Sequence, residues 1–213
     1  MECYTPPAMS MPSDPAAKVL PFDSEPEAVH QLDRVKLGMW FFLVSEAVLF
    51  ITLFVLYGIL RAQADAWPRG RDYLSLPIGA ANAAVLVFSS ITMVLAWAAV
   101  LRRHREGYRL AMGITVAAGG VYLLLKGLEY HAKISQGLLP NTNLFLGLYY
   151  TVTGVHILHA VGGVLYNAWL LGPGSRDWHV RPQAFRTRVE AAGLFWHFVD
   201  LMWLFIFPLL YVL

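Results

Sequence analysis

The chain has 213 residues, of which 57% are hydrophobic and only 14% are charged. Its formal net charge is +2 at pH 7, and the lysines and arginines are spread over several segments. A dense basic patch of the kind that neutralises a nucleic acid backbone is missing from this sequence. The composition therefore favours a polytopic membrane protein over a soluble domain, and nucleic acid is not an expected partner.

The N-terminal segment differs in composition from the rest of the chain. Residues 1–37 contain six of the 12 prolines and no apolar run, so we expect a flexible polar tail without a cleavable secretory signal. The single cysteine, Cys3, has no second cysteine with which to form an internal disulfide or a thiolate metal site. We expect an inert thiol at this position.

Five later stretches are long and apolar enough to cross a membrane, which takes about 20 residues for roughly 30 Å of hydrocarbon. They lie near residues 38–60, 77–101, 109–128, 144–171 and 191–213. The sequence thus predicts an all-α fold, a bundle of five transmembrane helices over residues 38–213. Eleven of the 16 Lys and Arg residues fall on the side of the N-terminal tail. This asymmetry predicts a cytoplasmic N-terminus and a C-terminus on the outer, periplasmic side.

Small residues recur at helical spacing on two of the predicted spans. Gly113, Ala117, Gly120 and Gly127 share one face of the third span, while Gly147, Thr151, Gly154 and Gly162 share one face of the fourth. Such stripes allow helices to approach closely. We expect both to be packing surfaces between helices.

Polar side chains inside the spans are costly in lipid, so they should be paired or hydrogen-bonded. Five of them fall within a band about 10 Å tall, and Glu190 lies on the same face of the fifth span as His197. These groups are Glu46, His156, His159, His197 and Asp200. We expect a buried polar cluster that includes His156, His159, Glu190, His197 and Asp200.

Two interpretations of this cluster remain open. The side chains could fix how the helices dock, with His197 and Asp200 as a hydrogen-bonded pair, or they could relay protons or hold a lipid or cofactor. Glu46 has no opposite charge within its own span and is the candidate for a proton-linked group. His156 and His159 also raise haem ligation as an alternative.

Lys126 and Glu129 lie one helical turn apart near the outer end of the third span. We interpret them as an interfacial ion pair with a snorkelling lysine. No set of residues closes a metal site, and no phosphate-binding glycine loop or activated nucleophile is apparent in the sequence. A small transporter is a rival class, but it should show paired broken helices or an internal repeat, and the sequence shows neither.

Four motifs in this order resemble subunit III of the haem-copper respiratory oxidases. They are GMWFFLVSEAVLF at 38–50, LKGLEYHAKISQGL at 125–138, LYYTVTGVHILHAVGG at 148–163 and VEAAGLFWHFVDLMWLFIF at 189–207. The resemblance covers roughly residues 32–213. It implies a non-redox accessory subunit of a proton-pumping terminal oxidase in a bacterial inner membrane, in which oxygen is reduced to water.

The resemblance further implies that the chain packs on subunit I, alongside subunit II, with haem and copper only in those partner subunits. It carries no cofactor of its own, although phospholipid binding between its helices is expected. Glu46 corresponds to the carbodiimide-reactive carboxylate of the family's Ser-Glu motif. Glu129, His156, His159, Glu190, His197 and Asp200 correspond to its other buried polar positions.

Some family members have seven spans, with two additional helices before the Ser-Glu helix, and this chain resembles the five-span form. The face of the first span that those helices would cover is expected to meet lipid or another subunit. The electron donor stays open between cytochrome c and quinol. A quinol oxidase, a nitric oxide reductase system and a haem-binding, quinol-oxidising membrane subunit remain alternatives.

Overall fold

The computed structural model describes residues 26–212, and every regular element among them is helical. The helices are α1 (Pro26–Gln63), α2 (Gly70–Tyr73), α3 (Leu76–Leu101), α4 (Arg105–Ser135), α5 (Leu144–Leu171), α6 (Asp177–Val180) and α7 (Pro182–Phe207), with a 3-10 turn at Pro173–Arg176 and a π-helical turn, η2, at Pro208–Val212. Helices α1, α3, α4, α5 and α7 are each long and apolar enough to cross a membrane. The prediction of an all-α, multi-pass membrane protein with five spans is confirmed.

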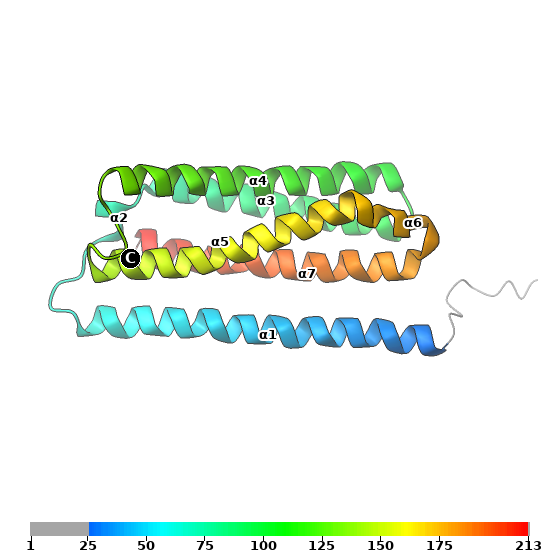
Figure 1. Ribbon diagram of the computed structural model, residues 1–213, viewed down its shortest axis with the longest axis horizontal. Helices are drawn as coiled ribbons and strands as arrows, with labels where there is room; N and C mark the ends of the chain where they lie inside the picture. The colour runs from blue at the N-terminus through cyan, green and yellow to red at the C-terminus, as the bar shows by residue number, and fades with distance from the viewer. Residues whose placement is uncertain (1–25, 213) are drawn as a thin grey trace, which may run out of the picture.

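The five long helices run side by side and alternate in direction along the chain (Figure 1). Helix α7 packs against α1, α3 and α5, while α4 packs against α3 and α5. Helix α1 lies at the edge of the bundle, where its main neighbour is α7. The connections 102–104 and 172–181 lie at one end of the bundle, and α2 and η2 lie at the other.

The boundaries of three helices correct the sequence predictions. Helix α1 already begins at Pro26, so the predicted tail of residues 1–37 is helical in its last part. Proline suits the first helical turn, and good helix formers follow it in the sequence. Residues 1–25, with Cys3, lie outside the described part of the chain. Helix α4 continues to Ser135 and α7 begins at Pro182 because polar stretches there bury one face against the bundle.

Aromatic side chains fill the centre of the bundle. Trp196 and Trp203 of α7 lie with Tyr122 of α4 and Tyr149 of α5 among the fully buried side chains. Helix α1 is different, since most of its apolar side chains face outward and Phe41 is 70% exposed. An outer surface of this kind suits contact with lipid or with another subunit.

Most glycines of the predicted small-residue stripes do not pack between helices. A Cβ added at Gly120, Gly127, Gly154 or Gly162 would meet nothing within 4 Å. The close contacts instead involve the adjacent glycines, Gly119 and Gly163, where an added Cβ would come within 2.9 Å of the Trp196 ring. One residue corresponds to a rotation of 100° around a helix, so the contact falls on a different face from the one predicted.

Candidate functional site

The predicted cluster of buried polar groups is not a single cluster in the structure. Its members occupy four environments: a pair between α1 and α5, a group between α3 and α7, an aromatic enclosure around His156, and an ion pair near one end of the bundle. A similar depth does not fix the direction in which each side chain points around its helix.

Glu46 of α1 is joined to His159 of α5. The Nε2 atom of His159 lies 2.8 Å from Oε2 of Glu46, and its Nδ1 atom lies 2.8 Å from the backbone oxygen of Val155. The side chains of His159 and Glu46 are 16% and 20% exposed, so the pair is largely but not fully enclosed. Phe50, one turn from Glu46, packs its ring against the imidazole with the ring centres 5.4 Å apart.

The geometry of this pair fixes how many protons it holds. The Val155 carbonyl can only accept a hydrogen bond, so Nδ1 of His159 must carry a proton. The bond between Nε2 and Glu46 then contains one further proton, which belongs either to a charged imidazole or to a neutral carboxyl group. Glu46 and His159 thus join α1 to α5 through one hydrogen bond.

A serine of α3 connects His197 and Asp200 of α7. The Ser90 hydroxyl donates to Oδ2 of Asp200 and lies 2.9 Å from Nδ1 of His197. Because the hydroxyl proton is directed to the carboxylate, His197 must be the donor in its contact with Ser90. The neighbouring Ser89 accepts a hydrogen bond of 3.0 Å from the indole nitrogen of Trp196. The predicted direct pair of His197 and Asp200 is thus bridged by a serine.

Sequence reasoning missed Ser89 and Ser90 as members of the site. Serine is common in transmembrane helices and often bonds its own backbone, as Ser89 also does with Leu86 at 2.7 Å. The available signal was two consecutive hydroxyl groups in the middle of an apolar span, at a depth similar to that of Asp200. A hydroxyl group at that depth is a suitable partner for an acid on another helix.

His156 lies in the centre of the bundle, away from Glu46. Its ring is completely buried and packs against Tyr122 and Trp203, with ring centres 5.7 Å and 5.3 Å away. Neither ring nitrogen has a hydrogen-bond partner among the described residues. The three histidines therefore have three different sets of neighbours. Within residues 26–212, no three His, Cys, Asp or Glu side chains are arranged to hold a metal ion.

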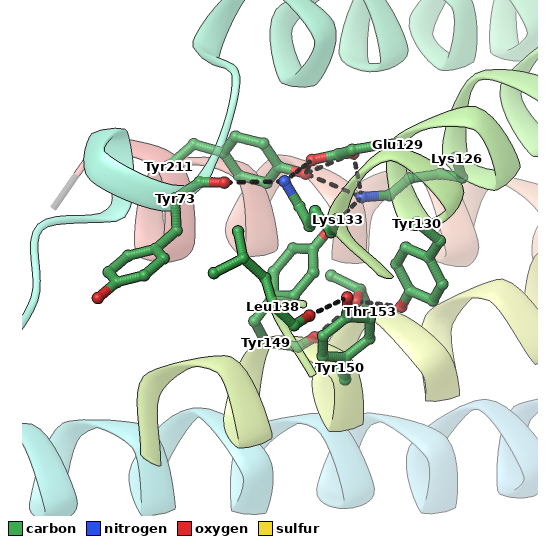
Figure 2. A network of polar contacts seen from close by, with 10 residues as sticks. All are labelled: Tyr73, Lys126, Glu129, Tyr130, Lys133, Leu138, Tyr149, Tyr150, Thr153 and Tyr211. Carbon is green, nitrogen blue, oxygen red and sulfur yellow. Dashed lines mark hydrogen bonds and ion pairs between the residues drawn. The ribbon is translucent and has the colours of Figure 1, made fainter. Parts of the chain in front are cut away.

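Lys126 and Glu129 form the predicted ion pair, at 2.9 Å, but the protein encloses both side chains. Their side chains are only 1% and 2% exposed. Figure 2 shows that Lys133 and Tyr211 converge on the same carboxylate. Lys133 approaches Glu129 to 3.3 Å, and the Tyr211 hydroxyl donates to it at 2.9 Å. The expected snorkelling lysine is wrong because aromatic rings, including Trp203 at 4.6 Å, enclose the ammonium group.

The same network ties the chain together at this end of the bundle. Lys126 donates to the Tyr211 hydroxyl at 2.8 Å, which joins α4 to η2. Lys133 donates to the backbone oxygen of Tyr73 at 2.9 Å, which joins α4 to α2 (Figure 2). Lys133 and Tyr211 were not recognised from the sequence. The available signal for Lys133 was its spacing, since residues 126, 129 and 133 follow one face of a helix.

Glu190 lies apart from the other acids, near the start of α7. Its carboxylate is 3.0 Å from the ammonium group of Lys36 on α1, and the two side chains are 26% and 45% exposed. The pair therefore joins α7 to α1, which agrees with the interpretation that Glu190 helps the helices dock. It lies outside the buried centre of the bundle. A partly exposed ion pair of this kind contributes only about 0–1 kcal/mol to the free energy of folding.

The sequence of this chain is similar to a known protein family and to several of its members. A family model described as cytochrome c oxidase subunit III matches residues 26–213. Cytochrome c oxidase subunit 3 of a Synechocystis species is 36% identical over 177 residues, which cover 83% of this chain and 74% of the relative. Cytochrome bo(3) ubiquinol oxidase subunit 3 of Pseudomonas aeruginosa is 32% identical over 180 residues, 83% of each chain.

A third relative, cytochrome c oxidase subunit 3 of Bacillus sp. PS3, is 29% identical over 198 residues and is covered over 94% of its length. The matched region includes all five membrane-spanning helices and every polar contact described above. The chain therefore belongs to the cytochrome c oxidase subunit III family.

Proposed function

We propose that this chain supports proton uptake and the stability of the catalytic subunit in a proton-pumping terminal oxidase. As a member of the subunit III family, it is an accessory subunit of a haem-copper oxidase complex. In the proposal, subunit I is its main contact, subunit II is a further partner, and the haem and copper lie in those partners. The complex lies in a bacterial inner membrane, with the N-terminus of this chain in the cytoplasm.

The pair of Glu46 and His159 is the observation that carries the proton-linked part of this proposal. It joins two spanning helices through a bond that contains one exchangeable proton. Both side chains remain partly accessible at the side of the bundle where α1 packs. An accessible group with a movable proton can supply or buffer protons for a neighbouring catalytic subunit, whereas a fully enclosed pair could not.

The test replaces Glu46 in the complete oxidase complex by Gln and by Ala. Thr52→Val is the matched control, because Thr52 lies on the exposed side of the same helix and bonds only its own backbone, at Val48. We expect both Glu46 variants to assemble, to lose activity earlier during sustained turnover and to pump fewer protons per electron. The control should behave as the original protein. Unchanged pumping and working lifetime in both Glu46 variants would refute the proton-linked role.

A quinol oxidase is the second candidate, and a specific observation favours keeping it. The relatives carry both names, with cytochrome c oxidase at 36% identity and ubiquinol oxidase at 32%. Within the proposal, the donor is bound by other subunits, so this chain is compatible with either. Oxygen uptake by the purified complex with reduced cytochrome c, compared with a reduced quinol, distinguishes the two candidates.

A further inference from the structure

Four residues at the centre of the bundle have buried polar atoms that bond no other group among residues 26–212. They are Tyr122 of α4, His156 of α5, and Asp200 and Trp203 of α7. Three of these residues are fully buried, and Asp200 is 5% exposed. The atoms concerned are the tyrosine hydroxyl oxygen, both imidazole nitrogens, Oδ1 of the aspartate and the indole nitrogen. Buried polar atoms in proteins are nearly always hydrogen-bonded, so this group requires a partner.

The four side chains lie together in the structure. The Tyr122 ring packs edge-on against His156 and Trp203, with ring centres 5.7 Å and 5.4 Å away. The rings of His156 and Trp203 are themselves 5.3 Å apart. Asp200 lies one helical turn before Trp203 on α7 and interacts electrostatically with Tyr122. The unpartnered polar atoms therefore surround one place between α4, α5 and α7.

Asn82 of α3 lies at the same level of the bundle. It is fully buried, and neither polar atom of its amide group has a partner in the described part of the chain. On the same helix, Gly79 lies against Phe207 and Ser90 bonds Asp200. Asn82 therefore lies opposite the part of α7 between those two residues. The layer of unpartnered polar atoms thus involves α3 as well as α4, α5 and α7.

The chemistry of these atoms determines which ligand can satisfy them. The indole nitrogen of Trp203 can only donate a hydrogen bond, so the ligand must accept one. An imidazole that is fully buried without a carboxylate partner is neutral, so one nitrogen of His156 accepts a hydrogen bond and the ligand must also donate. A metal cation cannot bind an indole N–H group, and a simple anion cannot donate. Water does both and is small enough for a packed interior.

We propose that at least two water molecules are bound at the centre of the bundle, in contact with Tyr122, His156, Asp200 and Trp203. One water cannot serve both nitrogens of His156, because they point to different sides of the ring. A buried water makes about three hydrogen bonds, so two waters suffice for the five polar atoms. Since Ser90 bonds the other oxygen of Asp200, the waters extend that contact into a network across four helices. This proposal does not depend on the proposed function.

Tyr122→Phe in the complete oxidase complex tests the proposal through the sign of its effect. If water bonds the hydroxyl, the substitution removes that bond, and the temperature at which this subunit dissociates should fall by about 2–4 °C. A hydroxyl buried without any partner is costly, so its removal would instead raise that temperature. Tyr130→Phe, which removes a hydroxyl bonded directly to Thr153, shows the effect of losing a formed bond. The exposed Tyr166→Phe is the matched control and should have no effect.

Cryo-electron microscopy of the same complex, at a resolution that shows ordered water, measures the site directly. We expect at least two water densities within about 3.2 Å of the polar atoms of His156, Asp200 and Tyr122. The density next to residue 122 should disappear in Tyr122→Phe. A map that shows ordered water elsewhere in this subunit but none at this place would overturn the proposal. A higher dissociation temperature for Tyr122→Phe than for the original protein would overturn it as well.

Discussion

Trp196 lies against Gly163 so closely that a Cβ at residue 163 would come within 2.7 Å of the indole ring. The same ring meets Gly119 of α4, and its nitrogen donates to Ser89 of α3. One side chain of α7 thus contacts three other spanning helices. Its position sets the spacing between the helices that hold the polar contacts.

The first prediction is that Gly163→Ala destabilises the chain by about 1–3 kcal/mol, the typical effect of overpacking a filled core. The adjacent Gly162→Ala is the matched control, because nothing lies within 4 Å of an added Cβ there. The stability of both variants is measured by heating the purified complex and recording the temperature at which this subunit dissociates. If the two variants dissociate at the same temperature, the close packing of Trp196 is incorrect.

Ser90→Ala should destabilise the contact between α3 and α7. The substitution removes a hydrogen-bond partner from both His197 and Asp200 and leaves a buried carboxyl group less satisfied, at a cost of about 1–3 kcal/mol. Ser135→Ala serves for comparison, since that exposed hydroxyl bonds only the backbone of its own helix, at Ala132. Denaturant unfolding should separate the two variants, and equal stability would show that Ser90 does not bridge the helices.

Tyr211→Phe should loosen the end of the bundle shown in Figure 2. It removes one hydroxyl group that bonds both Lys126 and Glu129, and hydrogen bonds to charged groups contribute about 1.5–3 kcal/mol. Tyr166→Phe, at a residue that is 39% exposed, is the control. Amide hydrogen exchange should increase at the end of α4 and in η2 only in Tyr211→Phe. Unchanged exchange there would contradict the role of the network in fixing η2.

The positions of the five spans could be predicted because apolar length is a local property of the sequence. The ion pair of Lys126 and Glu129 was also predictable, since residues three apart face the same side of a helix. Its burial was not predictable, because the enclosing rings of Trp203 and Tyr211 come from another part of the chain. Hydropathy assigns lysine to the membrane surface regardless of such partners.

Contacts between helices were the part that the sequence could not determine. Glu46 and His159 are separated by more than 100 residues, and their contact depends on the rotation of α1 and α5 about their axes. An error of one residue turns a helix face by 100°, which is why Gly120 and Gly162 were selected instead of Gly119 and Gly163. The division of the predicted polar cluster into four environments has the same cause.

Removal of this chain from the purified oxidase complex tests the central claim, that it is an accessory subunit without a redox centre, most directly. Optical spectra, metal content and oxygen uptake are measured for the depleted complex and for the separated chain. We predict that all haem and copper stay with the remaining subunits and that initial oxygen reduction continues, but that activity decays earlier during sustained turnover. Haem or copper retained by the separated chain, or immediate loss of oxygen reduction in the depleted complex, would contradict this account.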